Sequence, residues 1–600
     1  LVVDAETLEG SAWLRGAGLP MVTVTDGAVV PTVSKEEWLV SFVRQHPAVA
    51  ACRFLPGEPL AAELRVLVVP RVPDSSCLAD GAADDGDGAL SFWESIYDSV
   101  YESDALRCCE PAASSMGSDG AGGGPTAALD FSGWQSTYSG VAIPVEEMIE
   151  WRQTTLERLL ALSPSHVVEL GFGSGLLTWG LMPHIASYAG TDLSNEAVVR
   201  ARAEAAALGC GDKAAFAHAP AHRLDALPAE AVARCDTLIL NSVVHYFPNL
   251  RYLTSVVTAC VEALAATPRG GSFVVGDVRA LHLNPTFMLA VHTYRQAGAH
   301  HFQEVFRYAS SAVDEVTALA QGAELVDNQL LIHPGWWATL RAQLPQLTAV
   351  HVLPKRGVSM NELTKYRYDV IMRVASATAP PPPPSPTPLS PCPCSVDELV
   401  WTEDEGSLRA SVLASLTKGR HAIVRGMPNP RLSADANLAV AAGVVRATSP
   451  PLPAAEPKGS LSDPWFAASK LLPFREATLE LTFSATAPQL LDILIAPPPP
   501  HPDPANTAAC GPTERLPTCW FDCFHAKWAP AQLDPPTNDL ALATAARQLP
   551  SELDALLRPS LAGARVKIQL MHELPPTRAP DAAAASLGPP RERKLLARAG

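Results

Sequence analysis

Cysteine, basic residues and long apolar runs are all scarce in this sequence. There are 12 cysteines among 600 residues, and no pair of CxxC or CxxH spacings indicates a zinc site. We therefore expect free thiols in a reducing, cytoplasmic compartment and no bound metal. No apolar run reaches the roughly 18 residues that a membrane-spanning helix needs, so we expect no membrane partner.

Positive charge is in the minority. Lys and Arg number 45 against 62 Asp and Glu, which gives a formal net charge of −17. A nucleic-acid partner calls for a basic face, so we expect none. The chain begins at Leu1 rather than Met, and we expect it to be a piece of a longer polypeptide. The absence of a signal peptide then carries little weight.

Six hundred residues exceed what one hydrophobic core supports, so we expect two to four domains. Stretches rich in Pro, or in Ser, Gly and Ala, resemble linkers because they cannot build a core. They divide the chain into a segment 1–101, a linker 102–130, a central domain 131–374, a linker 375–394 and an α+β region 395–600. The last region contains a Pro-rich insertion at 495–513.

The central domain alternates strand and helix patterns. Apolar spacing predicts strands at 166–170, 186–192, 237–241, 272–277, 349–353 and 366–374, and helices at 145–162, 176–184, 195–208 and 253–266. This alternation predicts an α/β fold, a Rossmann-like and mostly parallel sheet with helices on both faces. Ligands of such sheets bind at the carboxyl ends of the strands.

A glycine-rich loop, E-L-G-F-G-S-G over 169–175, follows the first of these strands. The nicotinamide fingerprint G-x-G-x-x-G/A needs a small residue at 176, where this chain has Leu. The pattern E-x-G-x-G-x-G instead resembles motif I of class I S-adenosylmethionine (SAM)-dependent methyltransferases. A glycine turn without a ligand is the alternative. Asp192, which follows the loop at the end of the second strand, favours cofactor binding.

The resemblance implies a set of cofactor contacts. The loop would pass beneath the amino-acid part of SAM with Glu169 orienting it, and Asp192 would accept both ribose hydroxyls. Many of these enzymes meet the adenine amine with an acid after the third strand. The matching stretch 219–222 is A-P-A-H, so backbone groups would serve instead. The expected cofactor-binding residues are Glu169, Gly171, Phe172, Gly173, Ser174, Gly175, Asp192, Leu193, Ala221, His222, Asn241 and Ser242.

Five ordered motifs resemble a narrower family, the N-methyltransferase domains embedded in adenylation domains of nonribosomal peptide synthetases. They are W-E-S-I-Y-D (93–98), W-Q-S-T-Y-S-G-V-A-I-P (134–144), N-S-V-V-H-Y-F-P (241–248), G-D-V-R (276–279) and K-R-G-V-S-M-N-E-L-T-K-Y-R-Y-D-V (355–370). The flanks 43–70 and 552–577 resemble the small C-terminal subdomain of an adenylation domain. The family's N-G-K lysine is missing at 578–581, and the large ATP-binding subdomain is absent, so we expect no adenylation by this chain.

The resemblance implies methylation of the α-amine of an aminoacyl thioester, with an aminoacyl carrier protein as partner. An α-amine has a pKa of roughly 7.7–8.0, so a strong general base is not obligatory. The expected catalytic residues are His245, Tyr246, Asn361 and Glu362. The family often has Gln at the position of His245, so we do not expect an indispensable base there.

Other interpretations remain open. The enzyme could be a free-standing methyltransferase of small molecules, acting on oxygen or nitrogen, or the chain could be a degenerate scaffold. Tyr246 could be a core aromatic, and Glu362 could pair with Lys355 or Arg367. Asp277 and Arg279 are expected to form an architectural ion pair.

Overall fold

The computed structural model describes residues 129–297, 329–377, 396–441, 463–473 and 477–497, and shorter pieces at 23–25, 28–30, 40, 43–44, 46, 49–55, 63–70, 94–96, 98, 549–551, 553, 555 and 565–570. The linkers predicted at 102–130, 375–394 and 495–513 lie almost entirely outside these residues, as does most of 552–600. The chain divides into two compact units, Leu1–Val72 with Gln548–Gly600, and Pro73–Arg547.

The first unit contains strands from the two ends of the chain. Its sheet has the order β16-β4-β3, with β3 at Val49–Leu55, β4 at Glu63–Pro70 and β16 at Arg565–Leu570. Strand β16 is parallel to β4, and β3 is antiparallel to β4. A separate hairpin joins β1 (Thr23–Thr25) to β2 (Ala28–Val30). Segments from opposite ends of the sequence therefore complete one sheet.

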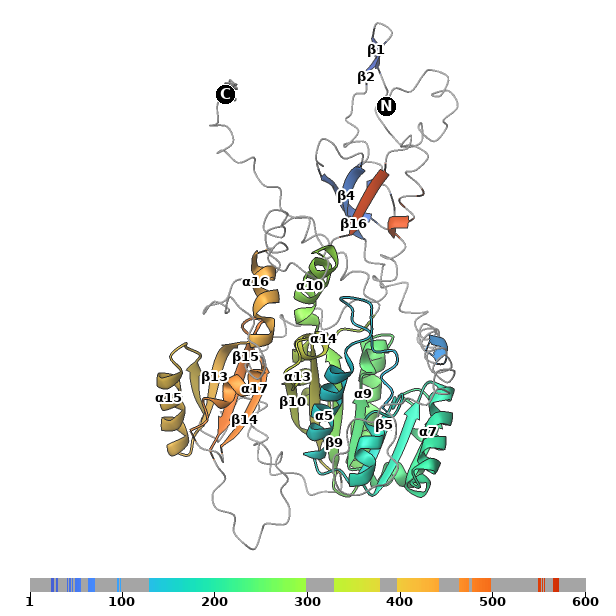
Figure 1. Ribbon diagram of the computed structural model, residues 1–600, viewed down its shortest axis with the longest axis vertical. Helices are drawn as coiled ribbons and strands as arrows, with labels where there is room; N and C mark the ends of the chain where they lie inside the picture. The colour runs from blue at the N-terminus through green and yellow to red at the C-terminus, as the bar shows by residue number, and fades with distance from the viewer. Residues whose placement is uncertain are drawn as a thin grey trace, which may run out of the picture. The chain divides into compact units, whose positions relative to one another are not determined.

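The second unit is built on a seven-stranded sheet with the order β10-β11-β9-β8-β5-β6-β7 (Figure 1). Its strands are β5 His166–Leu170, β6 Ser187–Asp192, β7 Ala214–His218, β8 Thr237–Asn241, β9 Gly271–Arg279, β10 Leu347–Pro354 and β11 Arg367–Val374. The strands from β9 to β7 run parallel, and β11 is antiparallel to both of its neighbours. The expected α/β fold with a mostly parallel sheet is confirmed.

Helices cover both faces of this sheet (Figure 1). They are α5 Val145–Leu160, α6 Thr178–Leu181, α7 Asn195–Ala207, α8 Ala229–Arg234, α9 Leu250–Ala266, α10 Asn284–Ala297, α13 Pro334–Gln343 and α14 Glu362–Tyr366. Successive residues of a strand point to opposite faces, so Leu238 and Leu240 join the core beneath α9. Ile239, between them, joins a second core with residues of α5 and α7.

Local sequence explains where two of these helices begin or end. Helix α7 begins after Ser194, whose side chain accepts a hydrogen bond from the Ala197 backbone N–H. The helix expected over 176–184 is shorter, because α6 ends at Leu181 and a 3-10 turn, Met182–His184, follows. Pro183 in that turn has no N–H to continue an α-helix. Helices α10 and α13 were not predicted.

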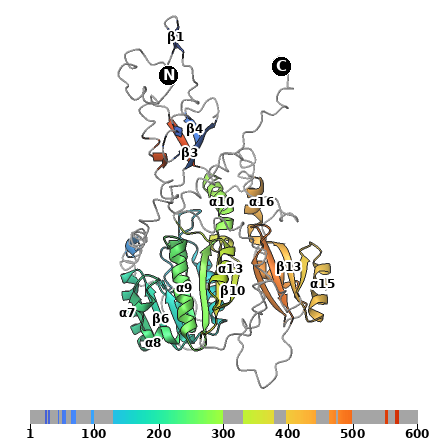
Figure 2. The ribbon, with the colours of Figure 1, turned by 180° about the vertical axis from the view of Figure 1, so that it is seen from behind.

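A second sheet in the same unit has the order β12-β13-β15-β14. Its elements are β12 Val396–Val400, α15 Glu405–Thr417, β13 His421–Pro428, α16 Ser433–Ala441, α17 Pro464–Ser469, β14 Thr478–Phe483 and β15 Leu490–Ala496. It lies beside the first sheet in both views, with β14 next to β10 (Figures 1 and 2). Thr482 Oγ1 donates to the Val352 carbonyl at 2.8 Å, and both sheets share one hydrophobic core.

No helix in the described part of the chain is both long and apolar enough to cross a membrane. Within the same residues, no group of three or more His, Cys, Asp or Glu side chains is arranged to hold a metal ion.

Candidate cofactor and acceptor site

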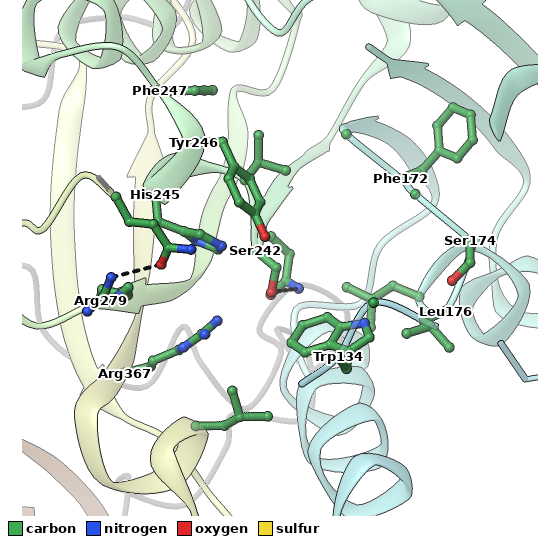
Figure 3. Close-up of a pocket in the computed structure, with 18 of the residues that line it drawn as sticks. Trp134, Phe172, Ser174, Leu176, Ser242, His245, Tyr246, Phe247, Arg279 and Arg367 are labelled. Carbon is green, nitrogen blue, oxygen red and sulfur yellow. Dashed lines mark hydrogen bonds between the residues drawn. The ribbon is translucent and has the colours of Figure 1, made fainter. Parts of the chain in front are cut away.

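A cavity of about 290 Å³ opens at the carboxyl ends of β5, β6, β8 and β9. In Figure 3 the labelled side chains fall into two groups, with Ser242 between them. One group contains Trp134, Phe172, Ser174 and Leu176, and the other contains His245, Tyr246, Arg279 and Arg367, while Phe247 lies apart from both at the top of the view. We call these the loop half and the arginine half of the cavity.

Most of the residues expected at the site line this cavity. They are Glu169, Gly171, Phe172, Gly173, Ser174, Asp192, Leu193, Ala221, Asn241, Ser242, His245, Tyr246 and Glu362. They come from several strand ends and from α14, so residues far apart in the sequence meet at one place. Parallel strands dictate this meeting, because their carboxyl ends share one edge of the sheet.

Three expected residues lie outside the cavity wall. Gly175 packs against the Trp179 indole, and exposed His222 places its Nδ1 2.9 Å from the hydroxyl of Tyr252, which does line the cavity. Asn361 caps α14, since its Oδ1 accepts from the Leu363 and Thr364 backbone N–H groups. The catalytic role expected for Asn361 stays a prediction, and the geometry shows a capping role for its side chain.

Two buried carboxylates fix the loop half. Glu169 Oε2 accepts from Tyr188 Oη at 2.7 Å and from Thr178 Oγ1 at 2.9 Å. Burial raises the pKa of Glu169 to about 7, although both hydroxyl hydrogen bonds oppose the shift. Asp192 Oδ2 accepts from the Gly173 N–H at 2.7 Å, which ties the end of β6 to the glycine loop.

The glycine loop needs left-handed backbone where it leaves β5. Gly171 has φ +76°, and a Cβ added there would lie 2.5 Å from Val243 Cγ2. Only glycine meets both conditions without strain. The tight turn lets the loop run beneath the cavity and leaves room there for a ligand.

The motif at 93–98 reaches the same region. Ser194, which begins α7, donates from Oγ to Asp98 at 2.5 Å. His218 Nε2, at the end of β7, lies 3.2 Å from Glu94 Oε1. This motif therefore contacts the chain just beyond Asp192 and the end of the neighbouring strand.

The arginine half contains a neutral imidazole. Burial, reinforced by the nearby charge of Arg367, lowers the pKa of His245 well below its usual range. Its Nδ1 has no hydrogen-bond partner among the described residues, and the same is true of Asn241 Oδ1. Buried polar atoms rarely stay unsatisfied. His245 and Asn241 both line the cavity, but these two atoms are themselves fully buried, so a ligand would complete their hydrogen bonding only after the side chains turn toward it.

Arg279 and Arg367 also line the cavity, and sequence reasoning missed both as site residues. Arg367 Nη1 lies 2.5 Å from Asp277 Oδ2, and Arg279 Nη1 donates to Gln329 Oε1 at 2.8 Å. The prediction of an ion pair between Asp277 and Arg279 is therefore wrong. Strand direction was the missed signal, because β11 is antiparallel and begins at the edge where β9 ends.

Asp277 belongs to a buried charge network behind the arginines. Lys355 Nζ lies 2.9 Å from Asp369 Oδ1 and 3.6 Å from Asp277 Oδ1, and Arg158 also pairs with Asp369. Although burial opposes the shift, the charges of Arg367 and Lys355 hold the pKa of Asp277 far below its usual range. Asp277 stays ionised and fixes the Arg367 guanidinium at the cavity.

Glu362 closes the cavity from the side of α14. Its Oε2 accepts from the Thr137 N–H at 2.8 Å and from Ser136 Oγ at 3.2 Å, and its Oε1 accepts from Thr137 Oγ1 at 2.7 Å. The pairing expected with Lys355 or Arg367 is absent among the described ion pairs. Glu362 instead holds residues 136–137 at the cavity. Aromatic lining residues that we did not predict include Trp134, Trp151, Tyr252, Phe287 and Tyr366.

Comparison with known proteins finds a family model that matches part of this region. Residues 168–275 match the family model described as a methyltransferase domain. CymA of Salinispora arenicola (strain CNS-205), a probable nonribosomal peptide synthetase, is 36% identical over 390 residues, which are 63% of this chain and 4% of that protein. Chondramide synthase cmdD of Chondromyces crocatus is 34% identical over 251 residues, 41% of this chain and 6% of that protein. The chain thus spans a small fraction of these relatives.

Among solved structures, this chain matches N-methyltransferase NodS from Bradyrhizobium japonicum WM9 in complex with S-adenosyl-L-homocysteine. It is 16% identical, and the match covers 37% of this chain and 87% of that chain with a TM-score of 0.22. The Rossmann-like fold is identified by the strand order of the seven-stranded sheet and its single antiparallel strand, and not by this likeness.

Proposed function

We propose that this chain, which contains a class I SAM-dependent methyltransferase domain, methylates the α-amine of an aminoacyl thioester held on a carrier protein. The methyltransferase domain, the SAM cofactor and the similarity to nonribosomal peptide synthetases are confirmed by the comparisons. The acceptor and the carrier partner are the proposal. The observation that carries it is the pairing of a neutral imidazole with two guanidinium groups in one half of the cavity.

The loop half fits SAM. Asp192, with a buried carboxylate held by backbone N–H groups, would bind the ribose hydroxyls. Ala219, Pro220 and Ala221 line the cavity beside the aromatic rings of Phe247 and Tyr252, a surface that suits a flat heteroaromatic ring. The Gly171–Gly173 backbone would lie beneath the amino-acid part. When bound, SAM supplies a methyl group already activated on a sulfonium.

The arginine half fits an amine next to a carbonyl group. His245 and Asn241 line the cavity, and their unsatisfied acceptors, Nδ1 and Oδ1, would bind the amine N–H groups once these side chains turn toward the acceptor. The guanidinium groups of Arg279 and Arg367 could donate to the carbonyl oxygen of the same aminoacyl group. An amine that lacks a neighbouring carbonyl would leave these donors unused, so the site favours aminoacyl acceptors.

The charges at this half also suit the chemistry of the amine. Positive groups disfavour a protonated amine, so the guanidinium groups would lower the pKa of an acceptor that is already partly neutral near pH 7. Neutral His245 would orient the amine by a hydrogen bond and would not act as a general base that removes its proton. Aligning the nucleophile is then the main contribution of the protein, and alignment alone is worth several kcal/mol.

The test is transfer of labelled methyl from SAM to three acceptors: an aminoacyl carrier protein, the same free amino acid and a simple amine. We expect kcat/KM to be highest for the carrier-bound acceptor. Asp192→Ala should weaken SAM binding, while Asp225→Ala, an exposed residue bonded to Arg223, should not. Equal transfer to a free small molecule would favour the free-standing enzyme. No transfer to any amine, with SAM binding intact, would reject the proposal.

A further inference from the structure

A buried arginine from the second sheet reaches into the methyltransferase domain. Arg431 lies in the 3-10 turn Pro430–Leu432 after β13, and its side chain is 1% exposed. Its guanidinium donates to the carbonyls of Lys355 at 2.6 Å and Thr364 at 3.2 Å, and to the carbonyl of Gly357. These carbonyls belong to the loop before α14 and to α14 itself.

The same part of the second sheet contacts α14 again. Asp435, on α16, lies 2.9 Å from Lys365 Nζ and accepts from Tyr366 Oη at 2.6 Å. Both residues belong to α14, and Asp435 is buried. Two charged side chains from one short stretch of the second sheet thus hold α14 and the loop that leads into it.

These contacts are geometrically demanding. Asp463 Oδ1 lies 3.3 Å from Arg431, and backbone carbonyl groups accept the other hydrogen bonds that its guanidinium donates within the described residues. Burial lowers the pKa of Arg431 to about 10, which still leaves the group charged at neutral pH. A buried cation is expensive unless its hydrogen bonds are well placed. Arg431 therefore fixes the positions of the carbonyls around it.

Helix α14 carries cavity residues. Glu362, Leu363 and Tyr366 all line the cavity, and Arg367 follows the helix directly. Glu362 holds residues 136–137 at the cavity through three hydrogen bonds. A continuous set of contacts therefore runs from Arg431 through α14 to the wall of the arginine half.

We propose that Arg431 and Asp435 are positioning residues for the acceptor side of the methyltransferase. The region of the second sheet then contributes to that site by holding α14 in place. The claim about activity rests on the proposed function, since it needs a methyl acceptor. Loss of these contacts should let α14 shift and misplace Glu362, Tyr366 and Arg367. The SAM side is built on β5 and β6, while the side-chain contacts of Arg431 and Asp435 go to α14, its preceding loop and Asp463, so SAM binding should be unaffected.

The experiment compares full-length wild type with Arg431→Ala, Arg431→Lys and Arg420→Ala. The control, Arg420, directly precedes β13 of the same sheet but pairs with Asp397 at the surface. For Arg431→Ala we expect kcat/KM for the acceptor to fall by about tenfold or more, with the SAM Kd within about threefold of wild type. Arg431→Lys keeps the positive charge but lacks the planar guanidinium that donates to several carbonyl groups at once, so it should recover only part of the loss. Arg420→Ala should match wild type.

Hydrogen exchange separates this inference from the proposed function. In Arg431→Ala the amides of 355–367 and 136–137 should exchange faster than in wild type, and those of the glycine loop should not, whether or not an acceptor is known. Unchanged exchange, or a parallel loss of SAM affinity, would overturn the positioning role. If wild type methylates no amine but the exchange pattern appears, only the proposed function fails. If Arg431→Ala does not fold, Asp435→Ala takes its place, and the same changes in hydrogen exchange and acceptor kinetics are expected.

Discussion

Arg279 and Arg367 lie directly opposite each other on the neighbouring strands β9 and β11, and both reach the cavity. Like charges in facing positions destabilise a sheet unless each has a partner. Asp277 is the partner of Arg367, and Gln329 accepts from Arg279. Two paired but cavity-lining guanidinium groups are the feature that would most restrict the proposed acceptor.

Arg279→Gln should therefore affect the acceptor and not SAM. The change removes the charge but keeps a hydrogen-bond donor, and we expect kcat/KM for the acceptor to fall by about 10- to 100-fold, since charge-assisted hydrogen bonds are the strong ones. The SAM Kd should stay within about threefold. Arg373→Gln is the matched control, because Arg373 lies near the other end of β11. Equal losses in both variants would show that the effect is on folding.

His245 provides the second prediction. Its pKa is well below the usual range, so the imidazole is neutral at pH 7 and has a ring nitrogen able to accept a hydrogen bond from the proposed acceptor. Glutamine can accept the same hydrogen bond, so His245→Gln should retain activity within about threefold. His245→Leu, of similar size and without an acceptor, should lose about tenfold or more. A pH–rate profile separates the roles: loss of an inflection near pH 6–7 in His245→Gln would indicate a general base instead.

The loop half could be predicted from the sequence because its signals are local. Strand, glycine turn, helix and Asp192 follow one another directly along the chain, and each follows from spacing or backbone chemistry. In the other half, His245 and Tyr246 were expected at the site, but Arg279 and Arg367 were not, because their place there depends on which strands are neighbours. Only the strand order places Arg279 opposite Arg367 and β14 beside β10. Arg431 is buried against the Lys355 carbonyl, which belongs to a loop of the first sheet and is distant in sequence.

Glu169 should make stability depend on pH. Its pKa is raised from 4.5 to about 7 because the carboxylate is buried. The folded protein then binds this proton more tightly than the unfolded chain, so the contribution to stability is fully present below pH 4.5 and is lost as pH rises through about 7.

Glu169→Gln isolates this contribution. The free energy of unfolding of wild type minus that of Glu169→Gln should fall by roughly 1–3 kcal/mol between pH 5 and pH 8, at about 1.36 kcal/mol for each pKa unit. Urea unfolding at a series of pH values measures it, and the difference removes the effects of the buried histidines. A difference that stays constant with pH would contradict the raised pKa of Glu169.

Gly175→Ala and Gly140→Ala together separate backbone strain from packing. Both glycines have left-handed backbone, with φ +79° and +73°. Either alanine should cost about 1 kcal/mol for that conformation. At Gly175 the new Cβ would also lie 2.3 Å from Trp179 Nε1, while at Gly140 nothing lies within 4 Å. Since the Trp179 ring packs against Phe216, it cannot move away freely. Gly175→Ala should therefore lose about 1–3 kcal/mol more in urea unfolding, as overpacked cores do. It should also weaken SAM binding measured by calorimetry, because the glycine loop moves with the indole. Equal losses in the two variants would mean that the loop accommodates a side chain at Gly175.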